Sequence, residues 1–116
     1  MKALRGHPEI GPSARMLGVR GGIDIPVERG LVRPGTGGMS VAPETPINLP
    51  RHRRPPGLGG SGKDPVWCIG QSCLGPSLRF RRDSPTHGVV EPSRVMTIGE
   101  YEAALAETLG GWGLVP

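Results

Sequence analysis

Glycine and proline constrain this chain more than any other residue types, because 20 glycines and 14 prolines stand among its 116 residues. Such a share lies in the range where a disordered chain has to be considered. However, charged residues make up only 21% of the chain and the formal net charge is +4, so charge repulsion does not keep it unfolded. The glycines and prolines separate short apolar segments, as they do in loop-rich β proteins. We therefore expect one small folded domain with an unusually large share of loops.

The ends of the chain and its apolar runs bear on its organisation and location. Residues 1–13 have no periodicity and are predicted to be an N-terminal tail, followed by a single domain at 14–116. No apolar run approaches the roughly 20 residues that span a bilayer, and the first residues lack the apolar core of a Sec signal peptide. We therefore expect no membrane partner, and either a cytoplasmic location or export by a machine that needs no such signal.

Short segments with strand patterns account for most of the expected regular structure. Residues 78–81 alternate with the period of a half-buried strand. Pro26 places the segment 23–27 at a sheet edge or a bulge, because proline cannot donate to a ladder. From residue 42 to residue 65 no pattern indicates regular structure. The predicted strands are 15–20, 23–27, 66–69, 78–81 and 87–91.

The clearest predicted element is a helix near the end of the chain. Thr97 and Glu100 have the spacing of a capping box, and Met96 and Tyr101 stand where a hydrophobic staple would flank it. Apolar residues then fall on one helical face, and the glycines at 110–111 stop the helix after about three turns. That face carries Ile98, Tyr101, Leu105, Leu109 and Trp112. The expected class is α+β with more strand than helix.

A glycine-rich string matches two nucleotide-binding patterns without their context. Residues 57–63, Gly-Leu-Gly-Gly-Ser-Gly-Lys, contain G-x-G-x-x-G and nearly match the P-loop. Both patterns need a strand before and a helix after, because the helix N-terminus supplies amides to the phosphate. Here Pro55-Pro56 precede the string and Asp64-Pro65 follow it, and Asp64 replaces the hydroxyl that would hold magnesium. We therefore predict a flexible surface loop.

Arginines form a second candidate feature. The run Arg51-His52-Arg53-Arg54, with Arg79, Arg81 and Arg82, carries the charge to contact nucleic-acid phosphates. Few aromatic residues are present for base stacking, and a dinucleotide, an acidic partner or simple solvation explains the same residues. In an RNA-directed enzyme, His52 and His87 would act as acid and base. These alternatives stay open at this level.

The two cysteines carry little information. Cys68 and Cys73 are too few for a zinc site unless His52 and His87 complete the ligand set. We expect free or semi-buried thiols and no metal.

Two strings of residues resemble a known group of proteins. The first is residues 29–41, Arg-Gly-Leu-Val-Arg-Pro-Gly-Thr-Gly-Gly-Met-Ser-Val, and the second is residues 87–96, His-Gly-Val-Val-Glu-Pro-Ser-Arg-Val-Met. In this order and at this separation, with the helix following, they resemble type VI secretion effector toxins whose fold is similar to ADP-ribosyltransferases. The first string is the more specific of the two. The resemblance covers about residues 15 to 112.

The resemblance implies an α+β fold of ADP-ribosyltransferase type, with a small, bent, split β-sheet, long loops, a C-terminal helix and a cleft for NAD. In such folds an Arg on the first strand contacts the cofactor, and a Ser or Thr on a second strand braces the site. A Glu on a late strand stabilises the oxocarbenium ion as nicotinamide leaves. The implied catalytic residues are Arg20 (with Arg15 as second choice), Ser40 and Glu91. The residues implied to contact NAD are Arg20, Thr36, Gly37, Gly38, Met39, Ser40, His52 and His87.

The implied chemistry is compatible with these residue types. Nicotinamide leaves as a neutral group, so the reaction needs a bound pyrophosphate, a buried ribose and a carboxylate near the developing positive charge. Arginine binds phosphate oxygens in pairs, and the glycines at 35, 37 and 38 would let main-chain amides approach the ligand.

The function that follows from the resemblance is that of a bacterial toxin that consumes NAD. It would transfer ADP-ribose to a macromolecule of the target cell or hydrolyse NAD. It would be made in the bacterial cytoplasm, delivered into a target cell without a Sec signal, and silenced by a cognate immunity protein. The alternatives are a non-catalytic basic module that binds nucleic acid or an acidic partner, and an RNA-directed toxin.

Overall fold

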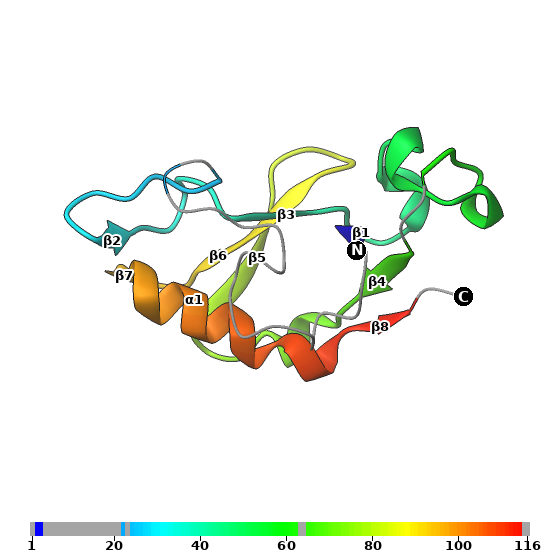
Figure 1. Ribbon diagram of the computed structural model, residues 1–116. Helices are drawn as coiled ribbons and strands as arrows, with labels where there is room; N and C mark the ends of the chain where they lie inside the picture. The colour runs from blue at the N-terminus through cyan, green and yellow to red at the C-terminus, as the bar shows by residue number, and fades with distance from the viewer. Residues whose placement is uncertain (1, 4–21, 23, 63–64, 115–116) are drawn as a thin grey trace.

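The computed structural model describes residues 2–3, 22, 24–62 and 65–114 (Figure 1). The described strands form three small antiparallel sheets. The central sheet has the order β3-β6-β5, with β3 at Met39–Val41, β6 at Gly88–Pro92 and β5 at Leu78–Arg82. A two-stranded sheet pairs β2 (Leu31–Val32) with β7 (Met96–Thr97). The third sheet has the order β1-β4-β8, at Lys2–Ala3, Val66–Cys68 and Gly113–Leu114.

Helix α1 (Ile98–Glu107) begins at the predicted capping box. The Thr97 hydroxyl accepts from the Glu100 main-chain N–H at 3.0 Å, and the Glu100 carboxylate accepts from the Thr97 N–H at 3.2 Å. These two bonds satisfy donors that the first turn of a helix leaves without partners. The helix gives way to the 3-10 turn η7 (Leu109–Gly111) at the predicted glycines. The prediction of this element is therefore confirmed.

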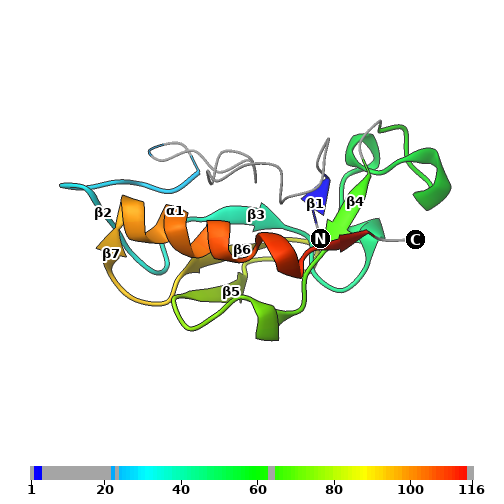
Figure 2. The same cartoon turned by 60° about the horizontal axis from the view of Figure 1, so that its bottom comes forward.

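One face of the central sheet packs against α1 to form the core (Figures 1 and 2). Side chains alternate along a strand, so the inward set of β3 is Met39 and Val41, and Val90 of β6 faces the same way. Tyr101 and Leu105 of α1 are completely buried among them. The opposite face of this sheet therefore carries Ser40, Arg79, Arg81 and Glu91, whereas Arg82, at the end of β5, lies on the face of Val90.

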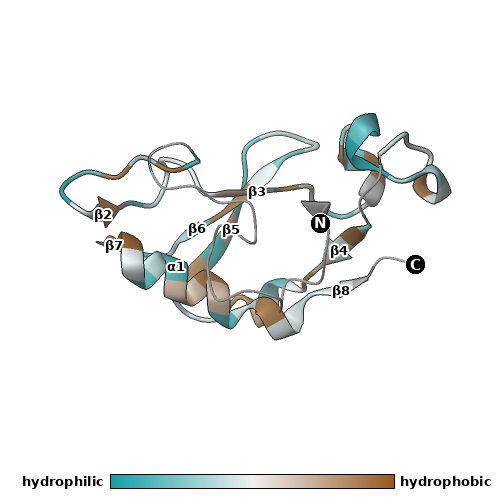
Figure 3. Ribbon diagram, in the orientation of Figure 1, coloured by the Kyte–Doolittle hydropathy of each residue, from teal (hydrophilic) through white to brown (hydrophobic). Residues whose placement is uncertain are grey.

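The segment between β3 and β4 is more ordered than the sequence predicts. Residues 42–62 form three 3-10 turns, η3 (Pro46–Asn48), η4 (Arg51–Arg53) and η5 (Pro56–Leu58). Figure 3 shows that η4 is strongly hydrophilic. The Ser61 and Gly62 main-chain N–H groups donate to the carbonyls of Arg51 and Arg54 at 3.0 and 2.6 Å. The glycine-rich string therefore folds back onto the basic run, and the next described element is strand β4, not a phosphate-binding helix.

The outcome for the other predicted strands is mixed. The strands predicted at 66–69, 78–81 and 87–91 are present as β4, β5 and β6, with ends shifted by one residue. The prediction of a strand at 23–27 is wrong for its described part, 24–27. Asp24 lies in a turn and Ile25 is an isolated bridge residue, since Pro26 has no N–H with which to continue a ladder. The strand predicted at 15–20 lies outside the described residues. Lys2 and Ala3, expected in a tail, pair with Trp67 and Val66 through main-chain bonds that need no side-chain pattern.

Small antiparallel sheets with one C-terminal helix confirm the predicted α+β class. Within the described part of the chain, no helix has the length and apolar character required to cross a membrane.

Candidate active site

The polar face of the central sheet brings together several of the predicted site residues. Val89 of the middle strand β6 lies between Ser40 of β3 and Arg81 of β5, and it is the register partner of both. Arg79 lies opposite Glu91. Because side chains alternate, all five residues project to one face. Ser40 and Glu91 are diagonal neighbours on adjacent strands, with side chains about 7–8 Å apart at their bases.

A small pocket of about 200 Å³ contains the Ser40 end of this face. His87, just before β6, and Arg53 of η4 line it with Ser40. The His87 Nδ1 lies 2.7 Å from the Asp83 carboxylate, which fixes the plane of the ring. Among the described residues the ring bonds through Nδ1 alone, so Nε2 remains for a bound molecule. The pocket thus presents a hydroxyl, an oriented imidazole and a guanidinium.

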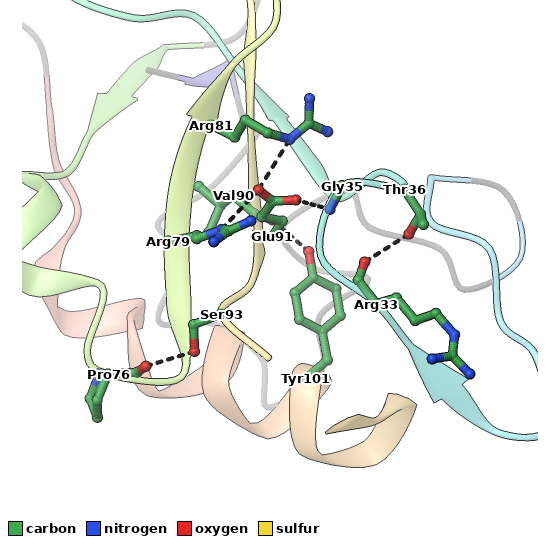
Figure 4. A network of polar contacts seen from close by, with 10 residues as sticks. All are labelled: Arg33, Gly35, Thr36, Pro76, Arg79, Arg81, Val90, Glu91, Ser93 and Tyr101. Carbon is green, nitrogen blue, oxygen red and sulfur yellow. Dashed lines mark hydrogen bonds and ion pairs between the residues drawn. The ribbon is translucent and has the colours of Figure 1, made fainter. Parts of the chain in front are cut away.

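Glu91 lies two residues along β6 from the partner of Ser40, and Figure 4 shows its contacts. Its side chain is 0% exposed. One carboxylate oxygen accepts from the Gly35 main-chain N–H at 2.5 Å. The other accepts from the Nε–H groups of Arg79 and Arg81 at 3.0 and 3.1 Å. Both oxygens are therefore engaged, and a direct bond from Glu91 to a substrate requires one of these contacts to be released.

The charge state of Glu91 follows from these contacts. Burial by itself raises the pKa of a carboxyl group, because it penalises the charged form. The bond from the Gly35 N–H and the bonds from Arg79 and Arg81 outweigh burial, so the pKa of Glu91 lies below its ordinary value of 4.5. Glu91 is therefore a carboxylate at neutral pH, and it ties β5 to the turn before β3.

That turn, residues 33–38, is the glycine-rich middle of the first string from the sequence. Gly35 has a φ of 79°, which glycine adopts readily, and Thr36 donates through its hydroxyl to the Arg33 carbonyl at 2.8 Å. A Cβ on Gly38 would lie 2.4 Å from the Val90 carbonyl oxygen, and one on Gly37 would lie 2.6 Å from that of Asp24. The glycines therefore permit the turn to press against two main-chain segments. The N–H groups of Gly35 and Gly38 are used inside the protein, not presented to a ligand.

Tyr101 connects the helix to the same region. Its hydroxyl donates to the Val90 carbonyl at 2.6 Å and accepts from the Met39 N–H at 3.2 Å. Met39 and Val90 are register partners in β3 and β6, so one hydroxyl links the two strands through their main chains. Burial, and to a smaller extent the charges of Asp24 and Glu91, raise the pKa of Tyr101 to about 12.

The structure separates the remaining predicted residues. Met39, predicted to contact NAD, is only 1% exposed and faces the core, because it neighbours Ser40 on a strand. His52 is exposed on η4 and is not among the residues that line the pocket. Thr36 is exposed in the turn. Arg15 and Arg20 lie outside the described residues.

Sequence reasoning missed Asp83 and the bridging role of Tyr101. Asp83 lies four residues before His87 across a hairpin, and the spacing alone does not indicate that they meet. The sequence predicts Tyr101 as part of the apolar helix face, and nothing in it names the partners of its hydroxyl. Both cysteines are free, and no group of metal-binding residues is found within the described ranges.

A larger cavity of about 580 Å³ lies on the other side of the central sheet. It is lined mainly by apolar side chains such as Val41, Phe80 and Leu74. Its charged residues, Glu44 and Arg82, already form an ion pair with each other. The smaller pocket is the better candidate, because catalysis of bond cleavage needs polar groups that converge.

Comparison with known proteins adds an independent finding. A family model described as "Tse2 ADP-ribosyltransferase toxin" matches residues 1–111. No curated protein and no solved structure was found to match the chain. The matched range includes the Ser40 pocket, the turn at 33–38 and the Glu91 network.

Proposed function

From the premise that this chain belongs to the Tse2 ADP-ribosyltransferase toxin family, we propose that it uses NAD to transfer ADP-ribose to a macromolecule of the cell it enters. The observation that carries the assignment of the site is that Ser40 and His87, drawn from two separate strings of the sequence, line one pocket. Hydrolysis of NAD uses the same cleavage step, with water as the acceptor, and is the second outcome of the test below.

Ser40 and His87 provide binding and proton transfer in this proposal. The Ser40 hydroxyl can both donate and accept a hydrogen bond, as holding a ribose hydroxyl or the nicotinamide amide requires. Asp83 holds the His87 Nδ1, so that Nε2 of the neutral ring accepts the proton of an attacking nucleophile. Nicotinamide leaves without protonation, so the pocket needs one base and no separate acid.

Glu91 enters the proposal as a positioning residue. It holds the turn at 33–38, and that turn leads directly into the strand that bears Ser40. Its part in the reaction is thus proposed to act through the shape of the site.

We also propose that the toxin is made in a bacterial cytoplasm, delivered by a type VI secretion system into a target cell, and silenced in its producer by an immunity protein. The support is the resemblance of the two strings to effectors of that system. The exposed arginines of the basic run and of β5 offer an acidic partner a complementary surface.

The proposed function is tested by inducible expression in bacteria without an immunity gene. Growth, cellular NAD and transfer of label from NAD to macromolecules are followed for the wild type, Ser40→Ala and His87→Ala. We expect growth arrest with label transfer in the wild type, and loss of both in the two variants. Ser72→Ala, at an exposed serine outside the pocket, is the matched control and keeps both.

Each other outcome has a definite meaning. A fall in NAD without labelled macromolecules identifies hydrolysis of NAD as the reaction. Growth arrest with constant NAD and no label transfer contradicts the use of NAD. In that case, toxicity that survives Ser40→Ala but is lost in His52→Ala and His87→Ala identifies an RNA-directed toxin. Normal growth with well-folded protein favours a non-catalytic binding module.

A further inference from the structure

Arg79 and Arg81 lie side by side above one atom. Both donate through Nε to the same oxygen of Glu91, at 3.0 and 3.1 Å. Their side chains are 52% and 36% exposed, whereas Glu91 beneath them is completely buried. The two guanidinium groups are therefore held at fixed positions on a surface by an anchor inside the protein.

Most of the donors of these two arginines are unused. A guanidinium group carries five N–H donors in a planar fork. Within the described ranges, only the Nε–H of each residue makes a hydrogen bond. Figure 4 shows the terminal nitrogens of Arg81 directed away from Glu91. Arginine frequently binds a carboxylate through two parallel bonds, but here each arginine makes one bond, and the Gly35 N–H occupies the second oxygen.

The charges at this point do not balance. Two guanidinium groups share one carboxylate, so one positive charge remains on the surface. The two guanidinium groups also repel each other, because both lie within about 3 Å of the same carboxylate oxygen. A bound anion with several oxygens would relieve the repulsion and accept bonds from both terminal forks.

We propose that Arg79 and Arg81 form a binding site for the diphosphate bridge of NAD. This inference rests on the proposed function. Val89 alone separates Ser40 from Arg81 in the register, so Arg81 lies two strand spacings from Ser40, or about 10 Å, and Arg79 lies two residues further along β5. They are on the same face as the pocket, so a dinucleotide lying across β6 reaches both. The buried carboxylate organises the arginines before the ligand arrives.

Binding of three probes tests the site directly. Inorganic pyrophosphate and ADP-ribose both carry the diphosphate group, whereas nicotinamide riboside has none. Titration calorimetry is carried out on the wild type, Arg79→Gln, Arg81→Gln and Arg82→Gln. Arg82 is the matched control, because it lies on the same strand but faces the other side and pairs with Glu44.

We expect each of the two site variants to weaken binding of pyrophosphate and ADP-ribose by about tenfold or more, and Arg82→Gln to change it by less than about twofold. Any affinity for nicotinamide riboside stays unchanged in all four proteins. Circular dichroism and thermal melting select variants that remain folded. Where a glutamine variant unfolds, Arg79→Lys or Arg81→Lys replaces it, because lysine keeps the charge beside Glu91 but lacks the planar fork.

Equal affinity for ADP-ribose in the wild type and the two site variants would overturn the inference. So would an unchanged KM for NAD in variants of an active enzyme, and in that case the proposed function stands. If pyrophosphate binds through these arginines but the wild type neither cleaves NAD nor transfers label from it, the proposed function fails. In that case the assignment of NAD as the ligand is also wrong, whereas the assignment of Arg79 and Arg81 as an anion site is retained.

Discussion

Replacement of Glu91 by glutamine tests the network beneath the polar face. Glutamine has nearly the same shape but offers one carbonyl oxygen and one NH₂ group in place of two acceptors. If its oxygen faces Gly35, its NH₂ meets the N–H donors of Arg79 and Arg81; if it faces the arginines, the NH₂ meets the Gly35 N–H. In both orientations, donors confront donors at a site with no exposed area.

The expected loss of stability follows from these contacts. A hydrogen bond to a charged group contributes about 1.5–3 kcal/mol, and an unsatisfied buried donor costs about 1–3 kcal/mol. Because the two arginines are partly exposed, water replaces some of what they lose, so the lower values apply. We expect Glu91→Gln to lower the free energy of unfolding by about 3 kcal/mol, the lower end of the range for a broken buried ion pair.

Urea denaturation followed by tryptophan fluorescence measures this change, with Glu44→Gln as the matched control. Glu44 also pairs with an arginine, Arg82, but is exposed, so its replacement costs about 1 kcal/mol or less. If Glu91→Gln is no more destabilised than Glu44→Gln, the network does not hold the turn and the reasoning is refuted.

The pH dependence gives a second reading of the same site. The pKa of Glu91 is lower in the folded protein than its ordinary value of 4.5, so the unfolded chain binds more protons below that pH. The stability that Glu91 contributes is therefore complete above about pH 5 and is lost as the pH falls through the folded pKa. We expect the difference between the wild type and Glu91→Gln to shrink on acidification below pH 4.5. A constant difference would contradict the lowered pKa.

Three further predictions concern the support of the pocket. Tyr101→Phe leaves the Met39 main-chain N–H of β3 without its partner and should lower the free energy of unfolding by about 1–3 kcal/mol in urea denaturation. In the wild type, Tyr101 is the single tyrosine of the chain, so its ionisation can be followed by absorbance. With its pKa raised to about 12, Tyr101 should ionise about two pH units above a free tyrosine, and the stability it contributes is lost between pH 10 and 12. Gly38→Ala should unfold the protein or destabilise it by several kcal/mol, because the new Cβ meets a main-chain carbonyl at 2.4 Å, whereas Gly57→Ala, with open space around it, should be neutral in thermal melting. Thr97→Ala removes the helix cap and should lower the free energy of unfolding by about 1 kcal/mol in urea denaturation, which is less than the loss expected for Gly38→Ala. A larger loss in Thr97→Ala than in Gly38→Ala would contradict this order.

Local signals explain which parts of the fold could be predicted. The capping box at Thr97 and the period of residues 78–81 each lie within a few residues, so neighbours in the sequence decide them. For residues 42–65 the sequence predicts no regular structure. The 3-10 turns found there could not be predicted, because they depend on main-chain contacts between the run at 51–54 and the glycines that follow it. Such contacts leave no hydrophobic period in the sequence.

The candidate site divides in the same way. Ser40 and His87 could be named from strings of residues, but their placement in one pocket depends on the pairing of β3 with β6, which are separated by nearly fifty residues. Glu91 could be named as a candidate, whereas its ion pairs with two arginines of a neighbouring strand could not. Register between strands decides these contacts, and one sequence does not specify register.

The bridge made by the Tyr101 hydroxyl ties assembly of the Ser40 pocket to the order in which the chain is synthesised. Strand β3 is made early, yet its hydrogen-bonding partner is β6, and the Tyr101 side chain that bridges the two strands follows later still. While the ribosome is still producing the first two thirds of the chain, strand β3, which bears Ser40, has neither its partner strand β6 nor the bridging hydroxyl of Tyr101. A nascent or prematurely terminated chain therefore has no assembled Ser40 pocket, and we expect a chain truncated before helix α1 to lack toxicity.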